Sequence, residues 1–399
     1  MTEVAEAERL IFEHLPRRGA GRAPLADCVD RVLAEDIKAD RDQPPFDRVT
    51  MDGIAIAGRD WDSGVRAFEI AGTQAAGAPP LALGGPGRCV EVMTGAMLPR
   101  GADTVIPVER IARDGRTATV DPRATVASHQ YVHPRGSDRR AGGLLLAAGT
   151  RIGPPEIAVL ASAGCATVAV AALPRVAIVS TGDELVDVDE PLAEYQIRSS
   201  NDRAIEASLV RARLARVTRA RLRDDAATLR TELATLLERA DVLVLSGGVS
   251  MGQFDLVPGV LAALGARRVF HRVQQRPGKP LWFGVGVGGQ PIFALPGNPV
   301  STLVCATRYL VPALRAAAGI APQPAEHVTL AAPAEAFAEL THFMPVKLAW
   351  SAAGAALATP CPTNTSGDFA ALAGTDGFVE LPARREAYSE GLAVRLFRW

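Results

Sequence analysis

The stretch that decides the fold is DVLVLSGGVSMGQFD, residues 241–255. Its first half is an apolar run rich in Val and Leu, which is typical of a strand buried on both faces in a parallel sheet. The run breaks at Ser246-Gly247-Gly248, and a helical pattern follows Asp255. Free backbone N–H groups in a glycine-rich turn and at a helix start can hold an anion such as phosphate. A tight turn without a ligand is the alternative for this loop taken alone.

Two further loops follow apolar strands in the same way, IVSTGDEL (residues 178–185) and ALPGNPVS (residues 294–301). The carboxyl ends of parallel strands meet at one edge of an open sheet, where ligands bind. Three such loops at one edge therefore favour a ligand site over three independent turns. The candidate binding residues are Thr181, Gly182, Asp183, Ser246, Gly247, Gly248, Ser250, Pro296, Gly297, Asn298, Pro299 and Ser301.

The charged residues of these loops limit which kind of ligand can bind. Asp183, Glu184 and Asp255 would repel phosphate unless a divalent cation lay between them. The pattern therefore predicts a phosphate-bearing ligand with Mg²⁺, although helix N-capping is the alternative for Asp183 and for Asp255. RPGKPLWFG (residues 276–284) adds Lys279 between two prolines, and a stiffened loop with a fixed cation suits an anion clamp.

Composition is that of an ordinary globular protein. The 399 residues are 48% hydrophobic and 22% charged, and the net charge of -1 gives no overall attraction to nucleic acid or membrane. The five cysteines form no C-x-x-C pair, which argues against zinc sites and a disulfide framework and favours a reduced, cytoplasmic protein. No basic, apolar leader and no run long enough to span a bilayer is expected.

The hydrophobic periodicity changes several times along the chain. Amphipathic helices are predicted at the N-terminus, near residues 25–34 and at PPEIAVLASAG (residues 154–164), and we expect these helices to pack together. Strands alternate with helices between residues 174 and 319, which predicts a parallel sheet covered on both faces. The expected division is a helical linker domain (1–45 and 142–173), a β-rich inserted domain (46–141), a central α/β domain (174–319) and a C-terminal β-barrel (320–399).

The β-rich insert carries three unusual segments. RVTMDGIAI places Asp52-Gly53 between apolar runs, and MTGAMLPRGADTVIPVE places Thr94 after another one. On pattern alone the Asp52-Gly53 segment is a β-turn. YVHPRGSD ends the insert with Asp138. His129 and His133 lack convincing metal-ligating partners, so we interpret them as residues of a surface loop.

Taken together, these motifs resemble the molybdopterin molybdenumtransferase family, which includes the MoeA-like proteins and the E domain of gephyrin. The resemblance covers nearly the whole chain. In chain order the motifs are MDG (51–53), MTGA-LP-GAD (93–103), RG-D (135–138), STGDEL (180–185), SND (200–202), SGGVS-G--D (246–255), PGKP (277–280) and LPGNPVS (295–301). The α/β part alone would also resemble the adenylyltransferases that share this domain, which is of the MogA-like, molybdopterin-binding type.

The resemblance implies an enzyme that performs the last step of molybdenum cofactor biosynthesis. Adenylylated molybdopterin and molybdate bind, the adenylate is hydrolysed, molybdenum is left on the dithiolene and AMP is released. It implies catalytic roles for Asp52, Thr94, Glu184, Asp255 and Lys279, with Asp138 beside them in the substrate site. Glu184 and Asp255 are the implied ligands of Mg²⁺.

The resemblance also implies partners and an assembly. The family is dimeric, with the β insert of one subunit facing the α/β domain of the other, which would bring Asp52 and Thr94 to the site. The adenylyltransferase of the preceding step and apo-molybdoenzymes are further implied partners. No nucleic acid or membrane partner is expected.

The sequence departs from the family pattern at a few positions, none of which is an implied catalytic residue. They are Ile54 in place of Tyr, Ser137 in place of Glu, Gln275-Arg276 before PGKP where Lys is common second, and Thr341-His342-Phe343 where an Arg-containing sequence is usual. These departures leave molybdenum and tungsten open as the inserted metal. Two other functions remain as alternatives, a molybdopterin adenylyltransferase-like enzyme and a non-catalytic dimeric scaffold.

Overall fold

The computed structural model describes residues 1–15, 19–249, 256–383 and 385–399. The chain forms two compact units. The first unit comprises Met1–Glu35, Ala148–Gly153 and Thr167–Trp399, and the second comprises Asp36–Ala147 and Pro154–Ala166. The finer division into four domains at residues 45, 141, 173 and 319 stays a prediction.

A six-stranded sheet is the centre of the first unit. In spatial order its strands are β16 (Arg216–Leu222), β13 (Arg175–Thr181), β17 (Val242–Ser246), β21 (Pro291–Leu295), β20 (Trp282–Val285) and β18 (Arg267–His271). The first four strands are parallel, as the alternation of strands and helices predicted. The last two are antiparallel. Only residues 286–290 join β20 to β21, and a parallel crossover needs about a dozen residues or more.

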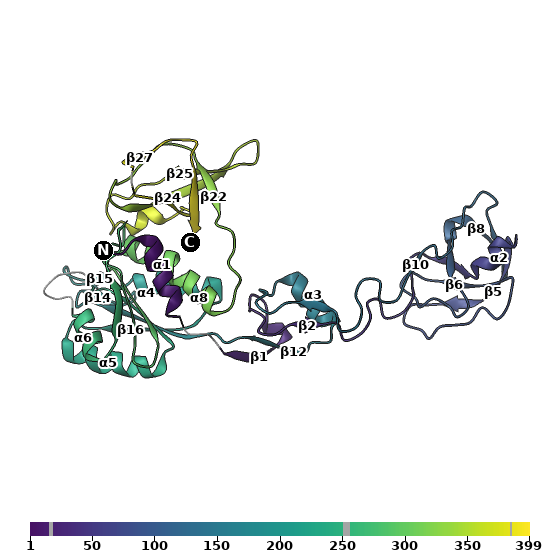
Figure 1. The fold of residues 1–399 in the computed structure, drawn as a ribbon, viewed down its shortest axis with the longest axis horizontal. Helices are drawn as coiled ribbons and strands as arrows, with labels where there is room; N and C mark the ends of the chain where they lie inside the picture. The colour runs from purple at the N-terminus through teal and green to yellow at the C-terminus, as the bar shows by residue number, and fades with distance from the viewer. Residues whose placement is uncertain (16–18, 250–255, 384) are drawn as a thin grey trace. The chain divides into compact units, whose positions relative to one another are not determined.

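Helices cover both faces of this sheet (Figure 1). Side chains alternate along each strand, so a strand of apolar residues presents an apolar surface on both faces of the sheet. Ala177 and Val179 face α5 (Ala226–Arg239) and α6 (Val257–Ala263). Val176 and Ile178 face the opposite layer. That layer contains α1 (Val4–Glu13), α4 (Asn201–Ala212) and a long helix built from α7 (Pro299–Cys305), a π-helical turn (Ala306–Leu310) and α8 (Val311–Ala317).

The N-terminal segment differs from its prediction in two ways. Helix α1 was expected to pack with residues 154–164, but Val4, Ala7 and Ile11 are buried in the core of the α/β sheet. The prediction of a helix near residues 25–34 is wrong. The structure has a strand β1 (Ala20–Pro24), paired with β12 (Thr167–Ala171), and a short 3₁₀ turn, Leu25–Asp27. The predicted helix at residues 154–164 is confirmed as α3 (Pro154–Ser162).

The C-terminal part of the first unit is a closed barrel, which confirms the predicted β-barrel. Its strands are β24 (Thr341–Trp350), β25 (Ala356–Pro360), β22 (His327–Leu330), β28 (Ala393–Arg398) and β26 (Gly377–Leu381), and β26 pairs back to β24. The short strand β19 (Gln275–Arg276) adds to β24 and connects the barrel to the α/β part. A two-stranded ribbon, β23 (Ala334–Glu335) with β27 (Ala387–Tyr388), and a 3₁₀ turn (Phe369–Leu372) complete it.

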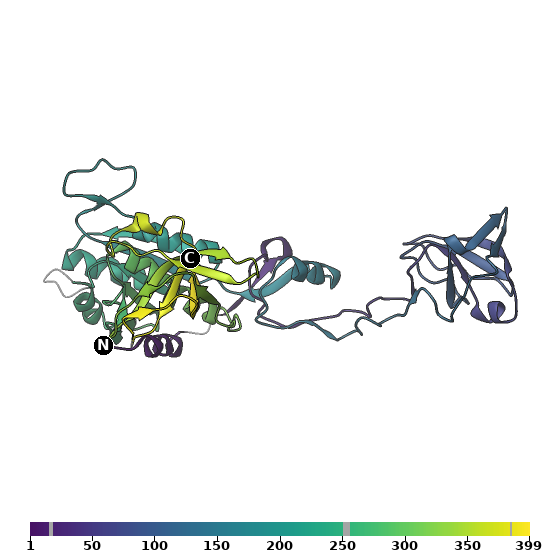
Figure 2. The same ribbon diagram turned by 90° about the horizontal axis from the view of Figure 1, so that it is seen from above.

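The second unit confirms the predicted β-rich insert. Its six-stranded mixed sheet has the order β7 (Thr104–Pro107), β4 (Gly53–Ile56), β6 (Arg88–Val92), β5 (Ala67–Gln74), β9 (Thr117–Val120) and β8 (Ile111–Asp114), coloured in purple and blue (Figure 2). Helix α2 (Gly58–Asp62) and a 3₁₀ turn (Val108–Arg110) lie between strands. Apolar side chains on both faces form this unit's own core.

Two short ribbons join the strands that enter and leave this sheet. They are β2 (Ile37–Lys38) with β11 (Leu144–Leu146), and β3 (Arg48–Val49) with β10 (Val132–His133). The first unit contains one more ribbon, β14 (Leu185–Val186) with β15 (Ile197–Arg198). Among the helices of the described residues, none has the length and apolarity that crossing a bilayer requires.

Candidate functional site

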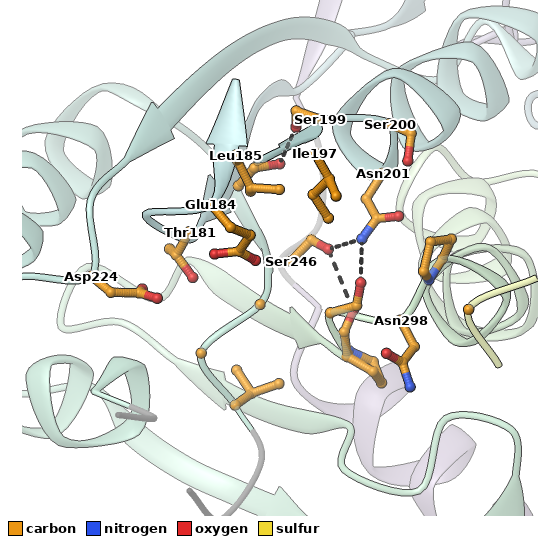
Figure 3. Close-up of a pocket in the computed structure, with 18 of the residues that line it drawn as sticks. Thr181, Glu184, Leu185, Ile197, Ser199, Ser200, Asn201, Asp224, Ser246 and Asn298 are labelled. Atoms are coloured by element: carbon orange, nitrogen blue, oxygen red, sulfur yellow. Dashed lines mark hydrogen bonds between the residues drawn. The ribbon is translucent and has the colours of Figure 1, made fainter. Parts of the chain in front are cut away.

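Three strand-end loops meet at the carboxyl edge of the parallel strands, as the sequence predicted. Strand β17 lies between β13 and β21, so the loops after these three strands are direct neighbours. They surround a cavity of about 590 Å³, here called the loop cavity. Its lining includes Thr181, Glu184, Asn201, Asp224, Ser246, Gly247, Gly248, Pro296, Gly297, Asn298 and Pro299. Figure 3 shows Thr181, Glu184, Asn201 and Ser246 around this one space.

Asn201 joins the second and third loops. Its side-chain amide donates to Ser246 Oγ at 2.8 Å and to the carbonyl oxygen of Gly297 at 2.7 Å (Figure 3). Asn201 is the first residue of α4, and its neighbour Asp202 is buried and accepts from Ser199 Oγ at 2.8 Å. Arg219 pairs with the second oxygen of Asp202 at 2.8 Å. The contacts of Asp202 hold the start of α4 in place, and Asn201 in turn holds the second and third loops together.

Glycine is required where the second loop passes the first. Gly247 has φ +102°, a backbone conformation that L side chains rarely adopt. A Cβ atom there would lie 2.5 Å from the carbonyl oxygen of Thr181. The two loops are therefore in backbone contact, and a side chain at this position would force them apart.

Two buried polar atoms on the cavity wall indicate a ligand. Within the described part of the chain, Thr181 Oγ1 and Asn201 Oδ1 have no hydrogen-bond partner. Buried polar groups without a partner cost free energy of about 1–3 kcal/mol each. Both residues line the loop cavity, so a bound molecule with polar groups would satisfy them.

The two carboxylates of the first loop, Asp183 and Glu184, have different surroundings. Glu184 lines the loop cavity, whereas Asp183 is exposed and pairs with Arg223 at 3.3 Å. The N-capping alternative for Asp183 is wrong, because the short strand β14 follows it rather than a helix. Gly182 is not part of the cavity lining. Ser250 and Asp255 lie outside the described residues.

A second cavity of about 730 Å³, here called the barrel cavity, adjoins the first and shares Pro280, Pro296 and Asn298 with it. Lys279 and Ser301 line it from the α/β side, and the barrel contributes residues such as His342. The remaining α/β lining includes Gln275, Arg276, Pro277, Gly278 and Val300. The Arg276 guanidinium lies 4.3 Å from the centre of the Phe337 ring.

The charged residues that line the barrel cavity are Arg276, Lys279 and Glu335. Burial lowers the pKa of His342, and the nearby Arg276 lowers it further, although a hydrogen bond with the Glu335 carbonyl acts in the opposite direction. His342 is therefore a neutral imidazole near pH 7. The cavity thus places two exposed cations against one exposed carboxylate, and this excess of positive charge suits a small anion.

The second unit holds the remaining implied site residues. Asp52 Oδ1 accepts from the backbone N–H of Thr94 at 2.6 Å and from Thr94 Oγ1 at 2.7 Å. These two bonds lower the pKa of Asp52, so its carboxylate is charged at neutral pH. Both residues are exposed, and the structure brings them together although 42 positions separate them.

Asp138 belongs to a different hydrogen-bonded group of the second unit. His133 Nε2 lies 2.9 Å from Asp138 Oδ1, and His133 Nδ1 lies 3.1 Å from Arg48. His133 was interpreted as a surface-loop residue, but it lies in strand β10, paired with β3. Its partners come from 5 and 85 positions away, and the second separation is too large for a local pattern to show.

Some cavity residues were missed by sequence reasoning. Asp224 follows the end of β16 and lines the loop cavity, so its position after a strand could have identified it. Asn201 belongs to the SND motif, but nothing in that motif indicated that its side chain would line the cavity. Ser366 gave no signal in the sequence, yet its hydroxyl accepts from the Asn298 amide at 2.6 Å. Among the described residues, no three His, Cys, Asp or Glu side chains are grouped as a metal site.

Comparison with family models matches almost the entire chain. Residues 2–164 match the MoeA N-terminal region (domain I and II), residues 177–316 match a probable molybdopterin binding domain, and residues 328–397 match the MoeA C-terminal region (domain IV). The three matched regions follow one another along the chain and leave only short segments between them.

Relatives and solved structures agree with this assignment. The chain is 38% identical to a molybdopterin molybdenumtransferase of Synechocystis sp. over 100% of both chains, and 30% identical to that of Bacillus subtilis over 98% and 93%. A crystal structure of a molybdopterin biosynthesis MoeA protein from Pyrococcus horikoshii matches with a TM-score of 0.85 and 31% identity, over 100% and 99% of the two chains. This chain therefore belongs to the MoeA family of enzymes, the molybdopterin molybdenumtransferases.

Proposed function

We propose that this protein inserts molybdenum from molybdate into adenylylated molybdopterin, with hydrolysis of the adenylate and release of AMP. The observation that carries the proposal is the pair of adjoining cavities. The loop cavity has a glycine turn and unsatisfied polar atoms, and the barrel cavity has two cations against one carboxylate. A nucleotide-bearing substrate fits the first, and a small oxyanion fits the second.

Residues of both cavities have a proposed part in this reaction. Thr181, Asn201 and the Gly247–Gly248 turn bind the phosphate-bearing substrate. Lys279 and Arg276 attract the oxyanion and hold its negative charge. Water cleaves the phosphoanhydride, AMP leaves, and molybdenum remains on the dithiolene.

Magnesium is part of the proposal. Mg²⁺ is usually held by one or two carboxylates together with substrate phosphates rather than by a cage of protein ligands. Glu184 and Asp224 both line the loop cavity, so its donor set fits a cation that is shared with the substrate. Glu184 would hold the ion together with Asp255, and the ion would neutralise phosphate charge.

We further propose that the working form is a homodimer in which Asp52 and Thr94 complete the partner's site. Four exposed apolar residues lie next to the Asp52–Thr94 pair in the sequence or are linked to its neighbourhood by backbone hydrogen bonds, and exposed apolar groups often mark interfaces. Met51 precedes Asp52 and Met93 precedes Thr94 in the sequence. The Val108 N–H donates to the Asp52 carbonyl, and the Tyr131 carbonyl accepts from the N–H of Thr50, which is two residues before Asp52.

AMP release from adenylylated molybdopterin, with and without molybdate in the presence of Mg²⁺, tests the reaction. Molybdate-dependent release with activation of an apo-molybdoenzyme is expected. Preferential release with tungstate would keep the mechanism and change the metal. Binding without release would instead support the scaffold, and release of pyrophosphate from ATP and molybdopterin would support the adenylyltransferase.

Mixed dimers test the shared site. Asp52→Asn and Glu184→Gln should each abolish AMP release when assayed alone. If each site combines residues of two chains, mixing the two variants should restore activity, because some mixed dimers contain one intact site. A mixture as inactive as its components would contradict the shared site, and a monomer in light scattering would contradict the dimer.

A further inference from the structure

The loop that carries Lys279 is held from inside the protein by a buried hydrogen-bonded network. The side chain of Gln275 is fully buried at its centre. Its amide nitrogen donates to the Gly278 carbonyl at 3.2 Å and contacts Cys305 Sγ at 3.4 Å. Its amide oxygen accepts from the hydroxyl of Tyr309. Every hydrogen-bonding contact of this amide is therefore made to the Lys279 loop or to the helix behind it.

Gly278 is fitted tightly into this network. Its φ of +93° and its close neighbours exclude other residues, since a Cβ atom would lie 2.5 Å from Cys305 Sγ and 2.6 Å from Gln275 Nε2. Its carbonyl also accepts from the N–H of Leu281 at 3.2 Å. The Lys279 carbonyl in turn accepts from Val273 at 2.9 Å. The backbone on both sides of Lys279 is thus fixed, while the Lys279 side chain remains exposed in the barrel cavity.

Tyr309 reaches Gln275 from the π-helical turn Ala306–Leu310. This turn lies in the helix that begins at Pro299, directly after the third cavity loop. A π-helical turn changes the direction of the side chains that follow it, and such turns are frequent at functional sites. One helix therefore contacts both the third cavity loop and the Lys279 loop. It meets the first at its start, through Asn298, and the second a few turns later, through Tyr309.

We propose that Tyr309 and Gln275 are positioning residues that set the place of Lys279 in the barrel cavity, and with it the affinity for the oxyanion. The inference deepens the proposed function and rests on it. Neither side chain needs to touch the substrate. Lysine is a point charge on a flexible stem, so its effective position depends on where the backbone holds it.

The decisive variant is Tyr309→Phe, which removes one hydroxyl and keeps the ring. Gln275 then loses the donor to its oxygen, and the Lys279 loop loses its link to the helix. We expect the KM for molybdate to rise about tenfold with kcat changed by less than about twofold, because a contact that binds ground state and transition state equally affects KM alone. The KM for adenylylated molybdopterin should stay unchanged.

Tyr388→Phe is the matched control. The Tyr388 side chain is also buried and its hydroxyl donates to a backbone carbonyl, that of Pro382, but this bond lies in the barrel and is not part of the Gln275 network. Any general effect of removing a buried hydroxyl should therefore be similar in both variants. Equal changes in KM for the two variants, or none in Tyr309→Phe, would overturn the proposal.

Crystal structures of the full-length wild type and both variants separate this inference from the proposed function. Tyr309→Phe should displace the Gly278 carbonyl and the Lys279 backbone, and Tyr388→Phe should not. If the wild type released no AMP with molybdate, the proposed function would fail. The position of the Lys279 loop in the Tyr309→Phe structure would still decide whether Tyr309 positions Lys279. An unmoved loop in Tyr309→Phe would refute the positioning role whatever the enzyme does.

Discussion

Asn201 is the side chain on which the loop cavity depends most. It is the first residue of α4 and donates to both Ser246 and Gly297, so one amide sets the spacing of two loops. We expect Asn201→Ala to raise the KM for adenylylated molybdopterin about tenfold, which corresponds to about 1.4 kcal/mol of binding free energy. Steady-state kinetics would measure it. Arg211→Ala, on the exposed end of the same helix, is the control, and equal KM values for the two variants would contradict this role for Asn201.

The Asp52–Thr94 pair makes a prediction about pH. The hydrogen bonds from Thr94 lower the pKa of Asp52 in the folded protein. A lowered pKa stabilises the fold above the unfolded value of about 3.9, and this contribution is lost as the pH falls through the folded value. Wild type should therefore have a higher melting temperature than Asp52→Asn at pH 7, and the two should converge in acid.

The control for this pH effect is Asp114→Asn, at an exposed position of strand β8 in the same sheet. Its melting temperature should follow that of the wild type over the whole range from neutral to acid. A constant difference between wild type and Asp52→Asn, independent of pH, would show that the substitution acts by a change in packing rather than through charge.

At the scale of elements, Arg308 joins three parts of the first unit. It lies in the π-helical turn with 1% of its side chain exposed, and pairs with Glu8 of α1 at 3.0 Å and with Glu380 of β26 at 3.2 Å. Burial opposes its charge, but the two carboxylates outweigh that effect and raise the pKa of Arg308. Helix α1, the long helix and the barrel therefore share one buried cation.

We expect Arg308→Met to destabilise the first unit by about 3–5 kcal/mol, because it leaves two partly buried carboxylates without their cation. Arg398→Met is the control, since its pair with Glu326 is close to half exposed on both sides and should contribute less than about 1 kcal/mol. Chemical denaturation followed by tryptophan fluorescence would measure both. Equal effects would show that burial does not strengthen the Arg308 pairs.

The elements that could be predicted from the sequence are those whose signal is local. Helix α1 follows from an apolar stripe, and the three loops follow from glycines after buried strands. The helix expected near residues 25–34 failed because Val32 and Leu33 form β-bridges with Arg151 and Val170, far along the chain. Such a pairing leaves no trace in local periodicity.

The same limit applies to the site. Glycine, lysine and carboxylate residues were identified because their chemistry is visible in the sequence, and the adjoining cavities do contain Glu184, Ser246 and Lys279. Gln275 and Tyr309 were not identified. Their contact spans 34 positions and depends on the π-helical turn, for which residue propensities give no signal. The antiparallel strand β20 could have been foreseen, since the link to β21 is too short for a crossover.

At the scale of the whole molecule, each unit has its own apolar core, so we expect two unfolding transitions in calorimetry. Ile56→Ala, in the core of the second unit, should lower the free energy of unfolding of that unit by about 2–5 kcal/mol and shift one transition. Ile178→Ala, in the core of the α/β sheet, should shift the other. A single transition that both substitutions move equally would show that the units unfold together.

The ribbon formed by β2 and β11 makes the insert replaceable. Lys38 and Leu144 are direct partners in an antiparallel pair, so the chain leaves and re-enters at points about 5 Å apart. A two-residue hairpin turn spans such a gap. Residues 39–143 could thus be exchanged for Asn-Gly, or for a foreign domain with adjacent termini, without altering the backbone on either side. The β-rich insert is therefore joined to the rest of the chain by two neighbouring strands, and an exchange of residues 39–143 needs only two closely spaced junctions.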